Sequence, residues 1–306
     1  MADVAAVQAK LEQGLESLMS DQGFRDYLRV QARFATYSFG NTLLILTQRP
    51  DATRVAGFHA WREMGRSVKK GEHGIQILAP MVRRDTHPPD LPGAGETVER
   101  PPDVWFRPVY VFDIAQTEGR SLPDLDIHDL AGATDQGQAL KAGLLDLARM
   151  EGLNVILNSQ ECGEAHGFYR PAVREIHVAP GLAVDQQAKT LAHELAHHLL
   201  GHGGHGESAR SVAEVQAESV AFIVCQARDV ASAAYSLPYV ADWAPGQDAK
   251  AKLAAIRQAL PPVQRAASHM LGAMQDRERE GPEPRREHAA RPMRRHHPEA
   301  AVEMGR

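Results

Sequence analysis

The chain has 306 residues, of which 43% are hydrophobic and 24% are charged. This composition excludes a wholly disordered chain, and the length predicts two domains, since domains average roughly 150 residues. Two cysteines exclude a disulfide scaffold and a four-cysteine zinc site, and the net charge of −5 argues against a nucleic-acid binder held by bulk charge alone.

Neither a targeting segment nor a membrane span is expected. Charged residues interrupt the apolar positions of the first twenty residues, and no later run approaches the roughly 18 apolar residues that a spanning helix needs. We therefore expect a cytoplasmic protein that does not associate with a membrane.

Residues 1–121 carry the patterns of a mixed α/β domain. Helical spacing of apolar residues covers 4–18 and 24–34, a short apolar run covers 42–47, and a short helix with Trp61 is expected over 57–64. Alternation predicts strands over 74–80 and 104–112. The Pro- and Gly-rich stretch 86–103 between them is interpreted as a flexible loop at the tip of a hairpin.

Residues 122–275 carry the patterns of a second domain, so the whole chain is expected to be of the α+β class. Helices are predicted over 136–151, from about 185 to 200, over 212–226, and near 248–259 and 262–274. A strand is predicted over 154–157, and a hairpin runs out through 167–170 and back through 175–178. Residues 276–306 have few large apolar side chains and are interpreted as a disordered tail.

Chemistry is most clearly indicated by the HExxH pattern at 193–197, inside a predicted helix. Residues four apart lie on one helical face, so His193 and His197 can direct two imidazoles at one ion such as Zn²⁺. Glu194 can then act as a general base on a water at the metal. The same five residues also occur by chance in soluble helices, but apolar flanks and a following Gly-rich turn favour a functional site.

The third protein ligand is expected on the next helix, where Glu214 and Glu218 are one turn apart. Two histidines and one glutamate, with water in the fourth position, make a catalytic zinc set. The natural division makes Glu214 the ligand and Glu218 the acceptor that orients a ligand imidazole through its other N–H. The reverse division stays open. His198, His202 and the residues of the glycine turn are interpreted as having no required role.

Basic residues interleaved with aromatic ones mark the first segment, which has 12 Lys/Arg and 9 Asp/Glu over residues 1–85. Such a pattern suits single-stranded DNA, because cations track the backbone and aromatic rings stack on bases. The same pattern is also expected when the basic residues form a solvated surface and the aromatic residues belong to the core. The candidate contacts are Arg49, Arg54, Trp61, Arg66, Lys69 and Lys70.

Two resemblances extend this interpretation. The runs TYSFGNTLLIL at 36–46, VKKGEHGIQILAP at 68–80 and VFDIAQTEG at 111–119 resemble the N-terminal domain of ArdC-type antirestriction proteins, which implies binding of single-stranded DNA. The runs TLAHELAHH at 190–198 and EVQAE at 214–218 are similar to ImmA/IrrE-type metallopeptidases, a gluzincin-like group with a zincin-like fold.

The second resemblance implies zinc ligands at His193, His197 and Glu214 and a catalytic role for Glu194. One departure is Glu218, where such relatives often have Asn or Asp. A zinc metallo-endopeptidase with an attached DNA-binding domain and an unidentified protein substrate is therefore expected. The competing hypothesis is a non-proteolytic protein that shields single strands, with a structural or vestigial zinc site.

Overall fold

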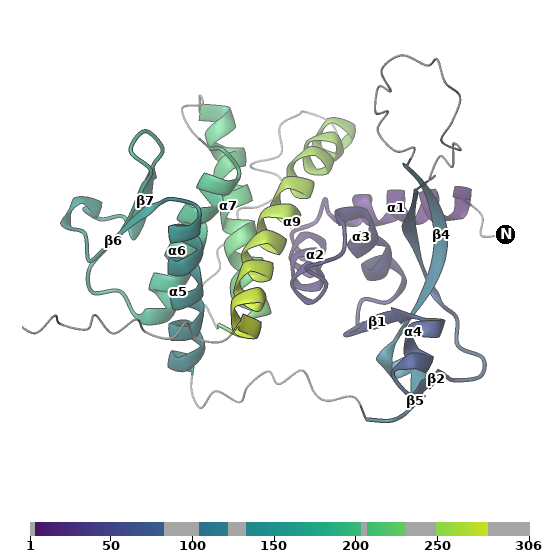
Figure 1. Ribbon diagram of the computed structural model, residues 1–306. Helices are drawn as coiled ribbons and strands as arrows, with labels where there is room; N and C mark the ends of the chain where they lie inside the picture. The colour runs from purple at the N-terminus through teal and green to yellow at the C-terminus, as the bar shows by residue number, and fades with distance from the viewer. Residues whose placement is uncertain (1–3, 83–103, 122–132, 203–206, 231–248, 281–306) are drawn as a thin grey trace, which may run out of the picture.

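The computed structural model describes residues 4–82, 104–121, 133–202, 207–230 and 249–280 (Figure 1). The architecture is α+β, as the sequence predicts, with sheets of strand order β1-β4-β3 and β6-β8-β7 and a small β2-β5 ribbon among the described residues. The described helices are α1 (Val4–Ser17), α2 (Asp21–Arg33), α3 (Phe39–Gln48), α4 (Phe58–Glu63), α5 (Ala133–Met150), α6 (Val184–Leu199), α7 (Glu207–Ala227) and α9 (Ala249–Glu280). The strands are β1 (Val55–Gly57), β2 (Arg66–Val68), β3 (Ile75–Val82), β4 (Val104–Asp113), β5 (Thr117–Gly119), β6 (Asn154–Leu157), β7 (Gly167–Arg170) and β8 (Glu175–Val178).

Serine caps fix the starts of two N-terminal helices. The Ser20 hydroxyl accepts a hydrogen bond from the Gly23 N–H at 3.0 Å, and Ser38 precedes α3 in the same way. Each cap satisfies a backbone donor that the first helical turn leaves without a partner. The helix α3 then ends just before Pro50, which disfavours helical geometry in the residue ahead of it.

Strands β3 and β4 form the predicted antiparallel hairpin, in register from Ile75↔Val111 to Val82↔Val104. Ile75, Ile77 and Val111 face a small core shared with α2 and α3. Because side chains alternate along a strand, Phe106 and Tyr110 point to the other face, where both are exposed. The loop predicted over 86–103 lies outside the described residues.

The second sheet lies beside the helices α5 and α6 (Figure 1). Strand β6 pairs in parallel with the central β8, and the edge strand β7 pairs antiparallel with β8, so the predicted 167–178 hairpin is confirmed. Helix α6 ends at Leu199, and Gly201 follows with a φ of 69°. Glycine adopts this left-handed conformation without the steric cost that other residues bear.

The two helices predicted near 248–259 and 262–274 are instead one continuous helix, α9, which contains Pro261 and Pro262. A proline inside a helix removes a hydrogen bond and costs about 3 kcal/mol. Buried apolar residues before and after the prolines offset this cost, because they form part of one core against α7. The helix continues to Glu280, into the region expected to begin the tail, and residues 281–306 lie outside the described part of the chain.

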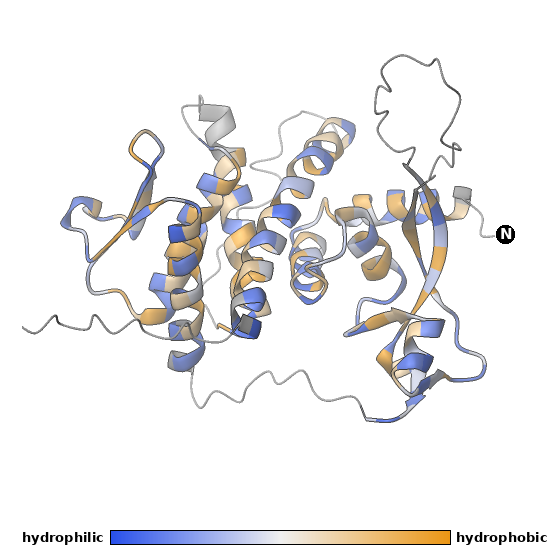
Figure 2. Ribbon diagram, viewed as in Figure 1, coloured by the Kyte–Doolittle hydropathy of each residue, from blue (hydrophilic) through white to orange (hydrophobic). Residues whose placement is uncertain are grey.

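One large hydrophobic core joins the two halves of the chain. It includes Phe24 and Leu28 from α2 together with buried residues of α6, α7 and α9, and α2 packs directly on α7. Gln264 of α9 also donates a hydrogen bond to the Ala35 carbonyl at 3.4 Å. Figure 2 shows hydrophobic and hydrophilic positions side by side on these helices, as amphipathic packing requires. The domain boundary expected near 122 falls outside the described residues.

Candidate metal centre

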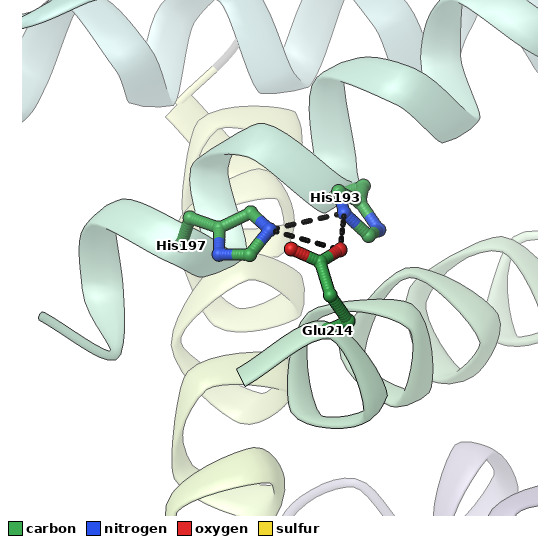
Figure 3. Close-up of side chains that lie close together, drawn as sticks. All are labelled: His193, His197 and Glu214. Atoms are coloured by element: carbon green, nitrogen blue, oxygen red, sulfur yellow. Dashed lines mark hydrogen bonds and ion pairs between the residues drawn. The ribbon is translucent and has the colours of Figure 1, made fainter. Parts of the chain in front are cut away.

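Helix α6 holds the two histidines of the HExxH pattern in a fixed orientation. Leu191, Ala192 and Leu195 are completely buried and anchor one side of the helix in the core. His193 and His197, four residues apart, consequently share the side that faces α7 (Figure 3). The spacing in the sequence therefore becomes a pair of adjacent imidazoles.

Three side-chain donor atoms converge at this point. The Nε2 atoms of His193 and His197 are 3.0 Å apart, and Glu214 Oε2 lies 3.4 Å from the first and 3.7 Å from the second. Tetrahedral bonds of about 2.0–2.1 Å place ligand atoms about 3.3–3.4 Å from one another, which matches the mean of these distances. The donor set fits a divalent metal ion, and the Glu214 side chain is 53% exposed, so the centre opens to solvent.

Glu218 lies on the opposite side of the His193 ring. Its Oε2 is 3.2 Å from His193 Nδ1, and its Oε1 is 2.8 Å from the Lys189 ammonium. Glu214 therefore approaches the two Nε2 atoms, whereas Glu218 approaches the nitrogen that points away from the convergence point. This is the arrangement expected when Glu214 is a ligand and Glu218 orients a ligand ring.

Charge and burial together perturb the titration of these groups. Burial alone lowers the pKa of His193, but hydrogen bonds to Glu214 and Glu218 outweigh it and raise the pKa to about 9. Burial likewise opposes ionisation of Glu218, yet the hydrogen bonds from His193 and Lys189 keep its pKa low. Hydrogen bonds from His193 and His197 lower the pKa of Glu214. Without a metal, the charges of Glu214 and Glu218 are balanced by His193 and Lys189, so a metal ion that binds here takes the place of a proton on His193.

The Glu194 side chain lies beside the candidate metal centre and is buried. Only 7% of the residue is exposed, and burial raises the pKa of its carboxyl group. The main chain of Tyr169, in the edge strand β7, donates a hydrogen bond to this carboxylate. A carboxylate with a raised pKa is better suited to accept a proton near neutral pH than an ordinary glutamate.

A second group of polar residues lies on the other side of α6. The Tyr169 hydroxyl is 2.9 Å from His198 Nδ1, and Glu151 lies between His198 and His269 at 3.6 and 2.9 Å. These contacts join β7, α5, α6 and α9, so the group ties helices together.

His202 is the site residue that the sequence analysis missed. Its Nδ1 lies 3.0 Å from His197 Nδ1, and its Nε2 lies 3.1 Å from the Gln216 side-chain oxygen. The only signal in the sequence was its position five residues after His197, which helix periodicity does not mark as a neighbour because α6 has already ended.

The structure contradicts Trp61 as a DNA contact. Trp61 is completely buried, and its indole N–H donates to the Phe112 carbonyl at 2.9 Å, so its ring cannot stack on a base. Arg66 braces β5 through bonds to Thr117 and Arg120, and Lys69 donates to the Ala115 carbonyl. The remaining candidates are Arg49, which lies 3.7 Å from Asp51, together with Arg54 and the exposed Lys70.

Other aromatic rings in this part of the chain are exposed on α4 and β4. We call Phe58, Phe106, Tyr110 and Phe112 the aromatic face, because the last three share one side of β4 and Phe58 contacts Phe112 edge to face with centroids 6.5 Å apart. Exposed fractions are 43% for Phe58, 60% for Phe106 and 49% for Tyr110. The Arg62 guanidinium lies 5.7 Å from the centroid of the Phe58 ring.

Comparison with known families agrees with both resemblances. Residues 4–112 match the family model for the N-terminal domain of anti-restriction factor ArdC, and residues 150–241 match the model for the IrrE N-terminal-like domain of the M78 peptidase family. Residues 4–112 are therefore similar to the ArdC-type N-terminal domain, and residues 150–241 are similar to the M78-type domain. The HExxH helix and Glu214 both lie within the second match.

Individual relatives are more distant. The chain is 25% identical over 269 residues to the uncharacterized protein pXO2-81 of Bacillus anthracis, an alignment that covers 76% of this chain and 45% of that protein. The chain therefore spans about half the length of that curated relative. Crystal structures of the antirestriction ArdC protein from the R388 plasmid, Mn(II)-bound and metal-free, are 18% and 19% identical, with TM-scores of 0.47 and 0.45. Both comparisons cover 78% of this chain and 83% and 84% of the respective structures.

Within the described residues, no helix combines the length and the apolar character that crossing a bilayer would require.

Proposed function

We propose that this protein is a zinc-dependent metallo-endopeptidase whose N-terminal part binds single-stranded DNA, with a role in antirestriction. The observation that carries the proposal is the convergence of His193, His197 and Glu214 beside a buried Glu194. A structural zinc site is usually closed by four protein ligands, whereas three protein ligands leave a position open for water, and a structural site has no use for a neighbouring carboxylate with a raised pKa.

In this proposal His193, His197 and Glu214 hold the ion, and Glu218 orients the His193 ring. Bound zinc supplies Lewis acidity that polarises a peptide carbonyl and acidifies a water. Glu194 takes the proton of the attacking water and returns it to the leaving amine. The buried surroundings of Glu194 favour this exchange, because they narrow the gap between its pKa and neutral pH.

The edge strand β7 offers a place for an extended peptide. It pairs with β8 on one side only among the described strands, and its Tyr169 reaches the Glu194 carboxylate through the main chain. A peptide that adds to such an edge gains main-chain hydrogen bonds and lies along the candidate centre. This geometry supports endopeptidase activity on an unfolded or flexible segment of a protein substrate.

The peptidase proposal is tested by metal analysis and by cleavage. Purified protein should contain about one zinc ion, which His193→Ala should lose. Glu194→Gln should keep the zinc and abolish the new peptide N-termini that the wild-type protein generates in a cell extract. A wild-type protein without metal under zinc-replete conditions would end the proposal, as would equal cleavage by Glu194→Gln.

The aromatic face supports the DNA-binding half of the proposal. Phe106 and Tyr110 are exposed along one side of β4, and Phe58 of α4 has the Arg62 guanidinium over its ring, which matches the stacking platform that sequence-independent single-strand binding uses. Residues 1–85, which include Phe58 and Arg62, carry a net charge of +3, from 12 basic and 9 acidic residues, and this charge favours a polyanion.

Fluorescence anisotropy with an oligothymidine probe tests this surface. Phe106→Ala and Tyr110→Ala should each weaken binding by roughly 1–3 kcal/mol, the usual worth of one stacked base. Met150→Ala is the matched control, since Met150 is 76% exposed but lies at the end of α5 in the other half of the chain. Lys70→Glu should reduce the salt dependence of binding. Unchanged affinity in both aromatic variants would place the DNA elsewhere.

The Glu194→Gln variant also distinguishes the peptidase proposal from the competing function, in which the protein protects single-stranded DNA without proteolysis. If Glu194→Gln shields single-stranded DNA from nucleases and restriction as well as the wild-type protein does, protection does not depend on cleavage.

A further inference from the structure

His202 connects the candidate metal centre to the backbone of α9. His197 Nδ1 is 3.0 Å from His202 Nδ1, His202 Nε2 is 3.1 Å from the Gln216 side-chain oxygen, and the Gln216 amide nitrogen donates to the Ala259 carbonyl at 2.9 Å. Three side chains from the end of α6, the turn after it and α7 thus form an unbroken chain of hydrogen bonds. All three are at least half-buried.

The directions of the two hydrogen bonds made by Gln216 follow from the far end of this chain. A backbone carbonyl can only accept, so the Gln216 amide nitrogen must face Ala259 and the amide oxygen must face His202. That oxygen can only accept, which requires a proton on His202 Nε2. In the neutral form of His202, the single ring proton is at Nε2 and the lone pair is at Nδ1, and His197 then donates from its own Nδ1.

The consequence for His197 is a defined tautomer. With the proton held at Nδ1, the lone pair is at Nε2, and Nε2 is the atom that lies 3.0 Å from His193 Nε2 and 3.7 Å from the Glu214 carboxylate. We propose that His202 and Gln216 are positioning residues that fix the tautomer and the ring orientation of His197, so that its Nε2 lone pair is presented to a metal ion. This inference rests on the proposed metal centre and extends it.

The two candidate ligand histidines are therefore supported differently. The Nδ1 atom of His193 contacts the carboxylate of Glu218, which is paired with Lys189, whereas the Nδ1 atom of His197 contacts the imidazole of His202, which in turn contacts the amide of Gln216. A carboxylate makes an imidazole more basic, while a neutral acceptor mainly orients it. Anchorage at Ala259 also makes the His197 orientation depend on the position of α9, which packs on α7.

The first test needs no variant. Long-range ¹H–¹⁵N correlation spectra of the metal-free wild-type protein at neutral pH identify which ring nitrogen carries each proton. The expected result is Nδ1–H for His197 and Nε2–H for His202. A His202 ring protonated at Nδ1 alone, or a His197 ring that averages between tautomers, would overturn the inference.

The second test measures Zn²⁺ affinity by competition with a chelator. His202→Leu, which has no acceptor, should weaken zinc binding 10–100-fold, the usual cost of losing an outer partner of a ligand. His202→Asn should recover most of the affinity, because its amide oxygen is attached to Cγ like the Nδ1 that it replaces. Gln216→Met should fall between them, and Gln226→Met, on the exposed side of α7, is the control.

The outcomes separate two kinds of failure. A wild-type protein that binds no zinc refutes the proposed metal centre itself. A wild-type protein that binds zinc, together with His202→Leu and Gln216→Met variants of unchanged affinity, refutes only the positioning role. Circular dichroism on each metal-free variant establishes that it is folded, and the wild-type spectra decide the matter if His202→Leu is not.

Discussion

The substitution Trp61→Phe distinguishes a core aromatic residue from a DNA-contacting one. Trp61 is completely buried in α4, and its indole N–H is bonded to the Phe112 carbonyl across the hairpin strand β4. Phenylalanine keeps most of the apolar contact but cannot donate this bond, and its smaller ring leaves a void. The expected effect is therefore on stability and not on the affinity of folded protein for DNA.

The magnitude follows from these two losses. A neutral hydrogen bond contributes about 1 kcal/mol to stability. Removing part of a buried aromatic ring costs roughly a further 1–2 kcal/mol in transfer free energy and cavity formation. Trp61→Phe should thus lower the free energy of unfolding by about 2–3 kcal/mol. The exposed Phe106 gives the opposite pattern, since Phe106→Ala should change stability by no more than about 0.5 kcal/mol.

Urea unfolding followed by circular dichroism measures the stability change, and anisotropy with the oligothymidine probe measures DNA affinity under conditions where both variants are folded. The two variants should show opposite effects: Trp61→Phe should lower the free energy of unfolding, and Phe106→Ala should lower the affinity for the oligothymidine probe. A Trp61→Phe protein of wild-type stability but weakened DNA binding would refute the assignment of Trp61 to the core.

Three further predictions concern the C-terminal half of the described chain. Gly167→Ala should cost about 1–3 kcal/mol in urea unfolding, because a Cβ would lie 2.6 Å from both the His177 carbonyl and a Thr190 methyl, whereas Gly272→Ala, in open helical space, should stabilise by about 0.5–1 kcal/mol. A hydrogen bond from His269 lowers the pKa of Glu151 below its ordinary 4.5, so ionised Glu151 stabilises the folded protein above pH 4.5. The difference in free energy of unfolding between the wild-type protein and Glu151→Gln should therefore shrink as the pH falls below 4.5. Because the pKa of His193 is about 9 without metal, zinc binding at pH 7 should release about one proton, measured by calorimetry in buffers of different ionisation enthalpy, and apparent zinc affinity should rise with pH up to about 9.

The sequence by itself determined those features that depend on periodicity within one element. The four-residue spacing of His193 and His197 places them on one face of any α-helix, and the apolar flanks indicate which side of that helix is buried. Alternation predicted the 74–80 and 104–112 strands and the 167–178 hairpin for the same reason, since side chains on a strand repeat every two residues.

The tertiary structure decided everything that depends on how one element is rotated against another. Glu214 and Glu218 lie on the same helical face, and only the packing of α7 on α6 sets Glu214 against the Nε2 atoms and Glu218 against Nδ1. His202 reaches His197 only because the chain turns back after Gly201.

Burial of aromatic residues followed the same rule. Trp61 and Phe58 are three residues apart in one short helix, yet Trp61 is buried and Phe58 stays 43% exposed, because only the side of α4 that packs on the strands β1, β2 and β4 is covered. Likewise, a proline pair predicts a break between two helices, and α9 is continuous because the burial of both segments against α7 outweighs the lost hydrogen bonds. The residues themselves fix the local preference for helix or strand, whereas burial of a side chain and continuity of a helix depend on contacts between segments that are distant in the chain.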